Sequence, residues 1–255
     1  MSKLALLIGI NYIGTPYQLS GCINDIVETK KILKEVYKYE EKDIVSLTDE
    51  TQVKPTADNI ISHLKTLAKR TNSEDIQEVW ISYSGHGSYI TDDNGDEDDR
   101  RDECLVPLDY NKSGLIRDDK IHMIIGYISG KTNIKIVIDA CHSETIIDLP
   151  YRYISGNKNV IENNRNKVKS NCLMISGCRD IETSADAYNI DNSQKFSGAM
   201  TSSLLSALKK FNYTITCWKL LKEMRQFLKD RKYSQISQLS SSRRVDDKTM
   251  FSKTN

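Results

Sequence analysis

The chain has 255 residues, enough for a single α/β domain with a substantial core. Its 36 Lys and Arg balance 35 Asp and Glu to a formal net charge of +1 at pH 7, which carries no electrostatic signature of binding to nucleic acid or to an anionic membrane. Its six cysteines lack the paired spacing of a zinc site, and no stretch approaches the ~20 apolar residues of a membrane span, so we expect a cytoplasmic protein with reduced thiols.

Strand and helix patterns alternate through the first third of the chain. Leu4 to Gly9 is an apolar run typical of a buried strand, and residues 22–37 place apolar side chains at helical spacing, with acids early and lysines late to suit the helix dipole. Asp43 to Thr48 predicts a second strand and Thr56 to Lys69 a second helix. This alternation predicts a doubly wound α/β sheet.

Two further apolar runs each end on a reactive side chain. The run from Val79 is followed by Ser84-Gly-His-Gly, and the run from Ile134 by Asp139-Ala-Cys. Both are typical of strands buried in a parallel sheet, so we expect His86 and Cys141 just past strand carboxyl ends, where open α/β sheets bind their ligands. If the two strands are parallel neighbours, imidazole and thiol emerge at one edge as a nucleophile pair.

The pair divides the chemistry of peptide cleavage. A free thiol has a pKa of about 8.5, so Cys141 needs a neighbouring imidazole to become a thiolate, and His86 can later protonate the leaving amine. The N–H groups of Gly87 and Cys141 can meet a developing oxyanion. Either residue alone is more often structural, as an inert buried cysteine or a satisfied strand-end histidine. The two together favour catalysis.

Asp139 precedes the nucleophile by two residues, so on a strand both side chains point to the same side. It is no activator of the thiol, because a nearby anion raises a thiol's pKa. Holding a cationic substrate side chain is the better use of this carboxylate.

A run of acids lies between the two motifs. Residues 92–103 hold eight acidic and two basic residues. An EF-hand is excluded, because aligning Gly95 with the loop's required glycine puts Ile90 at the first ligand position and Arg101 where the bidentate Glu belongs. Crowded carboxylates repel one another and gain from a hard cation, so calcium is chemically reasonable; a solvated charged loop is the alternative.

The rest of the chain is less specific. Tyr151 to Asn171 is polar and predicts an exposed loop, and Cys172 to Ser176 predicts a strand. Apolar stripes predict helices over Gly198 to Leu208 and Cys217 to Lys232, and weak alternation over Ser234 to Leu239 predicts a last edge strand.

The two motifs resemble those of a known family. Tyr83-Ser-Gly-His-Gly and Asp139-Ala-Cys-His-Ser are similar to the histidine and cysteine motifs of the metacaspases, the caspase-like cysteine proteases of plants, fungi, protists and bacteria. Most of the chain takes part, because further blocks resemble the family in family order: Leu4–Tyr12, Leu19–Asp25, Asp102–Asp109, Ile116–Asp119, Asp148–Pro150, Ser176–Cys178 and Glu182–Ala187.

The resemblance implies an architecture. It is the caspase-like three-layer sandwich, in which helices flank a mostly parallel central sheet. We expect a single catalytic domain over residues 1–255, close to a type I metacaspase without a prodomain. Its parts would be a large p20-like part over about 1–150, an exposed linker over about 151–171 and a small p10-like part over about 172–255.

The resemblance also implies a specificity pocket. Asp25 would join Asp139 in the pocket for the substrate residue before the cleaved bond (P1), with Cys22 and Ser84 on its walls. Two carboxylates can take an arginine guanidinium through a bidentate fork or a lysine ammonium as a point charge. They would repel the Asp that true caspases prefer, so we expect cleavage after Arg or Lys.

The resemblance further implies that calcium is held by Asp102, Asp118, Asp119 and Asp148. We therefore expect a monomeric, calcium-dependent cysteine endopeptidase that acts on proteins or peptides with Arg or Lys at P1 and that can cut itself in the basic segment 151–171. Glu144 stands where the family has glycine. It keeps open the alternative of a catalytically weak or inactive metacaspase-like module for interaction or calcium switching.

Overall fold

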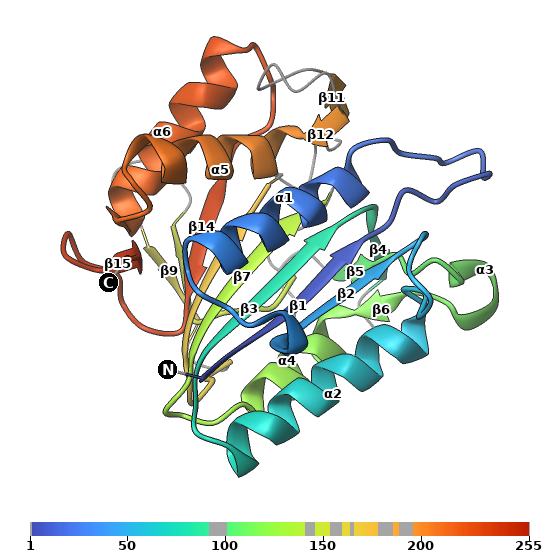
Figure 1. Cartoon of the computed structure of the whole chain (residues 1–255), viewed down its shortest axis with the longest axis horizontal. Helices are drawn as coiled ribbons and strands as arrows, with labels where there is room; N and C mark the ends of the chain where they lie inside the picture. The colour runs from blue at the N-terminus through green and yellow to red at the C-terminus, as the bar shows by residue number, and fades with distance from the viewer. Residues whose placement is uncertain are drawn as a thin grey trace.

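An eight-stranded sheet forms the centre of the molecule (Figure 1). The computed structural model describes residues 2–91, 101–140, 146–153, 160–163, 166–177, 186–188 and 196–254. In spatial order the strands are β2 (Ile44–Thr48), β1 (Ser2–Gly9), β3 (Ile76–Ser84), β7 (Asn133–Asp139), β10 (Asn171–Ser176), β14 (Gln238–Ser241), β8 (Tyr151–Tyr153) and β9 (Val160–Glu162). The first five are joined by parallel pairing and the last three by antiparallel pairing.

Helices cover both faces of this sheet (Figure 1). One face carries α1 (Cys22–Glu35), α5 (Ala199–Lys210) and α6 (Cys217–Asp230), and the other carries α2 (Ala57–Ser73) and α4 (Asp118–Gly126). Side chains of a strand alternate between faces, so β1 sends Leu4, Leu6 and Ile8 toward α2 and α4, and Ala5 and Leu7 toward α1, α5 and α6. The three-layer, mostly parallel α/β fold expected from the sequence is therefore confirmed.

Shorter elements complete the chain. They are η1 (Glu41–Asp43), α3 (Tyr110–Ser113), a three-stranded sheet of β4 (Gly87–Thr91), β5 (Arg101–Leu105) and β6 (Ile116–Arg117), and the pairs β11 (Asp186–Tyr188) with β12 (Phe196–Gly198) and β13 (Ile215–Thr216) with β15 (Met250–Ser252). In the parts of the chain that the structure describes, no helix is long and apolar enough to cross a membrane.

Two expectations about the second half of the chain are wrong. The strand expected at the sheet edge, β14, lies inside the sheet between β10 and β8. The segment expected as an exposed loop contains β8 and β9, which take the edge instead. The reason is Tyr153, a fully buried aromatic whose hydroxyl accepts a hydrogen bond from Val245 N at 2.7 Å and whose ring meets the edge of Trp218.

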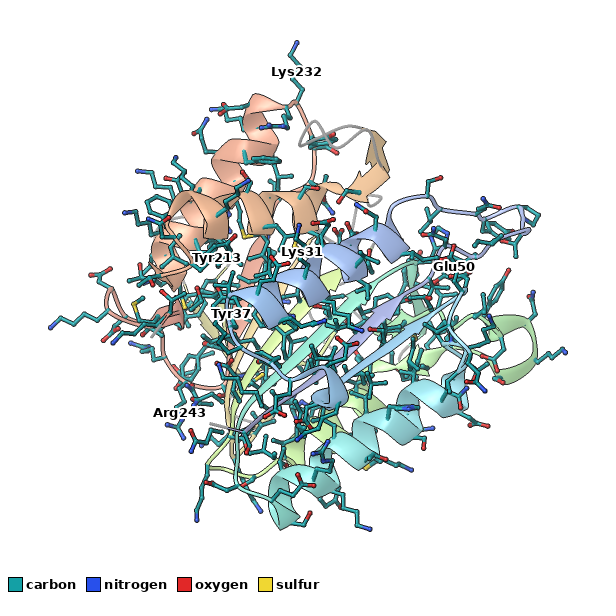
Figure 2. All side chains as sticks on the ribbon, viewed as in Figure 1. Lys31, Tyr37, Glu50, Tyr213, Lys232 and Arg243 are labelled. Atoms are coloured by element: carbon teal, nitrogen blue, oxygen red, sulfur yellow. The ribbon has the colours of Figure 1, made fainter. Side chains whose placement is uncertain are left out.

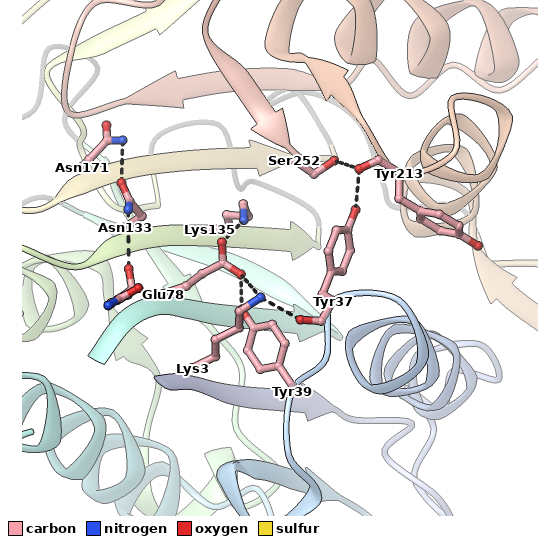
Figure 3. Close-up of polar contacts among 10 residues, drawn as sticks. Lys3, Tyr37, Tyr39, Glu78, Asn133, Lys135, Asn171, Tyr213 and Ser252 are labelled. Atoms are coloured by element: carbon pink, nitrogen blue, oxygen red, sulfur yellow. Dashed lines mark hydrogen bonds and ion pairs between the residues drawn. The ribbon is translucent and has the colours of Figure 1, made fainter. Parts of the chain in front are cut away.

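Polar contacts join the central strands β1, β3 and β7 near their amino-terminal ends (Figure 3). The Glu78 carboxylate on β3 pairs with Lys135 on β7 and lies 3.9 Å from Lys3 Nζ on β1, and Tyr39 donates to it at 2.8 Å. Burial acts to raise the pKa of Glu78, but Lys135, Tyr39 and Lys3 together outweigh it and the pKa is lowered. The cluster is therefore an ionised structural clamp across β1, β3 and β7.

Aromatic side chains extend this clamp toward the C-terminal part of the chain. Figure 2 shows Tyr37 and Tyr213 close to one another, whereas Lys232 projects from the surface. The rings of Tyr37 and Tyr213 meet edge to face at 6.1 Å, and the Tyr213 carbonyl also accepts from Ser252 Oγ at 2.9 Å. These contacts join three segments that are far apart in the sequence, and all of them lie away from the carboxyl ends of the parallel strands.

We predict that Gly9→Ala destabilises the fold by about 3 kcal/mol, since overpacking against backbone leaves little room to relax. A Cβ at Gly9 would lie 2.5 Å from the carbonyl oxygen of Cys22 and 2.6 Å from Ile26 Cγ1, so α1 would have to move off β1. Gly126→Ala is the matched control, because a Cβ there meets nothing within 4 Å. Denaturant unfolding measures both, and equal stabilities for the two variants would refute this account of α1 packing.

Candidate active site

The two motif strands are parallel neighbours, which meets the condition set for the two motifs to share one edge of the sheet. In the register of β3 with β7, Ser84 pairs with Asp139. His86 and Cys141 each follow a member of this pair by two residues along the chain. Cys141 itself, together with Glu144, lies outside the described residues.

The backbone of His86 is held by two buried tyrosines. Tyr12 Oη accepts from His86 N at 3.0 Å, and Tyr83 Oη donates to the His86 carbonyl at 2.7 Å. A Cβ at Gly85 would lie 2.9 Å from Tyr83 Oη and 3.0 Å from Tyr12 Oη, so this approach requires glycine. Burial and the neighbouring Tyr83 raise the pKa of Tyr12 well above its usual value, so its hydroxyl stays protonated.

The imidazole of His86 is oriented by a backbone carbonyl. Its Nε2 lies 2.7 Å from the carbonyl oxygen of Tyr17, and its ring lies against that of Tyr12 with centroids 4.7 Å apart. A carbonyl only accepts, so Nε2 carries the proton and the neutral ring has its basic lone pair on Nδ1. Sequence reasoning missed the parts played by Tyr12, Tyr17 and Tyr83, although Tyr83 stands inside the histidine motif.

The Gly87 amide is directed by the β4–β5 ladder. Gly87 pairs with Leu105, and Val106 N donates to the His86 carbonyl at 3.2 Å. This bond makes Gly87–Leu105 a non-hydrogen-bonded pair, in which the N–H of Gly87 points away from β5. The N–H of Gly87 therefore donates no hydrogen bond to β5.

The structure brings Asp25 and Asp139 together in a buried pair, 1% and 4% exposed. Ser84 Oγ donates to Asp25 Oδ2 at 2.6 Å. Cys22, also expected there, is buried at the start of α1, one turn before Asp25.

The segment that leads into α5, together with its first turn, supplies hydrogen-bond donors to both carboxylates. Asp25 Oδ1 accepts from Ser197 Oγ at 2.6 Å and from Gly198 N at 2.9 Å, and Asp139 Oδ2 accepts from Thr201 N at 2.8 Å. A Cβ at Gly198 would collide with both carboxylates. No local sequence signal identifies these residues, because they come from far along the chain.

Burial and the adjacent Asp139 raise the pKa of Asp25 to about 8, although its hydrogen bonds act to lower it. At neutral pH the two carboxyl groups therefore share one proton, and a cation could take the place of that proton. Such a site is suited to receive a positively charged group.

Of the four acids expected to bind calcium, Asp118 and Asp119 begin α4, and the other two lie on β5 and after the second motif. Asp102 on β5 and Asp118 at the start of α4 are each 1% exposed, Asp119 follows, and Asp148 has a left-handed backbone with φ 44°. Burial and repulsion by Asp102 and Asp119 raise the pKa of Asp118 to about 6. Carboxylate oxygens that repel one another suit a hard cation, so these four side chains are chemically suitable ligands for calcium.

The arrangement of these acids is not a finished metal site. Among the described residues, no three His, Cys, Asp or Glu side chains lie close enough together to hold a metal. Arg117 Nη1 lies 3.2 Å from Asp102 Oδ2, which gives that acid a cationic partner of its own. The acidic run 92–99 lies outside the described residues.

Buried cysteines elsewhere are poor nucleophiles. Burial raises the pKa of Cys104 to about 12 and that of Cys217 to about 12, and raises that of Cys172 further. These three thiols therefore stay protonated at neutral pH and are poor candidates for the nucleophile.

Comparisons with known proteins identify the family of the chain. Residues 3–150 match the family model described as metacaspase, peptidase C14 domain. Metacaspase-3 of Trypanosoma brucei brucei is 35% identical over 98% of this chain and 74% of its own, and metacaspase-1A of Neurospora crassa is 31% identical over 98% of this chain and 64% of its own.

A protein of Geobacter sulfurreducens of known crystal structure shares the fold. Its TM-score is 0.68 at 22% identity, over 97% of this chain and 96% of that one. Given the family match over more than half of the chain, and relatives such as metacaspase-3 that are 35% identical over 98% of it, this chain belongs to the metacaspases, a family of cysteine proteases.

Proposed function

We propose that the chain is an endopeptidase that cleaves peptide bonds after Arg or Lys, with Cys141 as nucleophile and His86 as general base. The observation that carries the proposal is the orientation of His86 at the sheet edge. Tyr17 O fixes its Nε2–H, which leaves Nδ1 as the proton acceptor, and the β3–β7 register gives Ser84 and Asp139 equivalent positions ahead of His86 and Cys141.

The reaction follows from these roles. His86 Nδ1 takes the thiol proton, and the thiolate attacks the carbonyl carbon while the N–H groups of Gly87 and Cys141 stabilise the oxyanion. The intermediate collapses as the C–N bond breaks, and the imidazolium gives its proton to the leaving amine. Water, deprotonated by His86, then hydrolyses the thioester and releases the acid.

Basic specificity is supported by the buried carboxylate pair of Asp25 and Asp139. A guanidinium or ammonium entering the pair replaces its proton and satisfies both acids, whereas an acidic side chain would bring a further negative charge to a buried site that already carries one. Ser84 beside Asp25 adds a hydroxyl for the same cationic group.

Calcium dependence forms part of the same proposal. Asp102, Asp118, Asp119 and Asp148 would hold the ion, supported by the mutual repulsion that raises the pKa of Asp118. Bound calcium would supply positive charge to these acids. We further propose a monomer that is able to cut itself within 151–171, where Lys167 and Lys169 belong to the described part.

Peptides that differ only at P1 test the proposal. Peptides ending in Arg or Lys should be hydrolysed at least about 100-fold faster than one ending in Asp, because a desolvated like charge is strongly disfavoured. Release of the fluorogenic group is followed with calcium and with chelator, beside Cys141→Ala. Faster cleavage after Asp would overturn the pocket, and no cleavage of any peptide would favour an inactive interaction module.

A further inference from the structure

A partly exposed guanidinium lies against one of the buried acids. The side chain of Arg117 is 40% exposed and that of Asp102 2% exposed, with Nη1 3.2 Å from Oδ2. Arg117 stands opposite Cys104 in the β5–β6 ladder, and Asp102 is two residues from Cys104 on the same side of β5. Arg117 also immediately precedes Asp118 and Asp119, so its position is fixed by two elements.

The charge of Arg117 lies next to the group of acids. Its guanidinium is paired with the buried Asp102 carboxylate, and Asp118 and Asp119 follow it directly in the chain. The guanidinium therefore supplies part of the positive charge that crowded carboxylates require. A divalent ion at these acids would supply charge of the same sign to the same place.

We propose that Arg117 is a tethered cation that holds Asp102 in the ion-free protein and competes with a divalent cation for it. The inference rests on the calcium site proposed above. A guanidinium and a calcium ion at one carboxylate repel each other, so binding requires Arg117 to leave Asp102. The affinity for calcium is thereby set below what the acids alone would give.

Replacing Arg117 with Gln should tighten calcium binding about tenfold, as expected for removing one charge a few ångströms from a divalent ion at intermediate dielectric. Arg117→Lys keeps the charge and should stay within about threefold of the unaltered protein. The matched control is Arg70→Gln, which removes the same charge from a side chain 36% exposed and paired with Asp43 at 2.9 Å at the far end of α2.

Titration calorimetry with calcium chloride on the full chain measures all four proteins without relying on activity. Thermal unfolding adds a second readout. Arg117→Gln should unfold at a lower temperature than the unaltered protein without calcium, because the ion pair between Arg117 and Asp102 is lost, and should gain more from added calcium.

The outcomes separate the two proposals. If the unaltered protein binds calcium and Arg117→Gln binds it no more tightly than Arg70→Gln, the role of Arg117 is refuted and the calcium site stands. If neither the unaltered protein nor Arg117→Gln binds calcium, the calcium site itself is wrong. Binding that is detected only in Arg117→Gln supports the competition.

Discussion

His86→Ala is expected to lower kcat/KM for an Arg peptide by about 10³-fold or more, because it removes both the base that forms the thiolate and the acid that protonates the leaving amine. Its stability should change little, since the imidazole is only partly buried and its backbone contacts with Tyr12 and Tyr83 survive the substitution. Steady-state hydrolysis and thermal unfolding measure the two effects.

A second readout separates general base catalysis from a structural role. Alkylation of Cys141 by iodoacetamide, followed by mass spectrometry across pH, reports the thiolate fraction. Loss of the imidazole should move the alkylation midpoint up toward the value of an ordinary thiol, about 8.5. Cys104, Cys172 and Cys217 should remain unlabelled in the folded protein, because burial raises the pKa of each thiol.

His63→Ala is the matched control. His63 lies on α2, where its Nδ1 contacts the carbonyl of Asn59 within the same helix at 2.7 Å, away from the sheet edge that carries His86. Its loss should leave both turnover and labelling of Cys141 unchanged. If His86→Ala retained turnover, or if both variants lost it equally, His86 would not be the base.

Local patterns in the sequence were enough to predict the strand that ends before His86 and the helices α1 and α2, whereas the pairing of β3 with β7 was only assumed. Apolar runs such as Leu4–Gly9 and amphipathic stripes such as that of α2 depend on side chains a few residues apart, and these are present in any window of the chain. A polar strand such as β14 has no comparable signal. Its place inside the sheet depends on contacts between distant segments, such as the hydrogen bond of Tyr153 with Val245, which is 92 residues further along the chain.

The residues that hold and orient His86 were less predictable, because they too come from distant parts of the chain. The hydroxyls of Tyr12 and Tyr83 that hold His86, and the carbonyl of Tyr17 that orients its ring, come from residues whose apolar or loop character gives no hint of their hydrogen bonds. Arg117 could be found only by pairing β5 with β6. Motifs predict which residues react, whereas the residues that orient them are selected by the fold.

The second large effect concerns Asp25. Asp25→Asn should lower kcat/KM for an Arg peptide by about 100-fold, because a neutral amide loses the charge-assisted hydrogen bond to the guanidinium. The nearly isosteric amide keeps an oxygen to accept from Ser197 or Gly198. Asp75→Asn, at an exposed aspartate between α2 and β3, is the control for net charge and should leave hydrolysis unchanged.

The same substitution should change how stability depends on pH. In the folded protein the pKa of Asp25 is about 8, against an ordinary value of 3.8. Between these values the folded chain keeps a proton that the unfolded chain has lost, so the stabilising contribution of this group is full below its unfolded pKa and is lost as pH rises through its folded pKa. The unaltered protein should therefore lose up to about 1.4 kcal/mol per pH unit from this group between pH 5 and 7.

Asp25→Asn cannot bind that proton, so its free energy of unfolding should decline less steeply over the same interval, and the difference from the unaltered protein should grow with pH in favour of the variant. Denaturant unfolding at several pH values measures this slope, with Asp75→Asn retaining the slope of the unaltered protein. An unchanged slope in Asp25→Asn would mean that the buried pair is already fully ionised. A pocket in that state would hold two negative charges before substrate arrives, and a cationic side chain would then bind without releasing a proton.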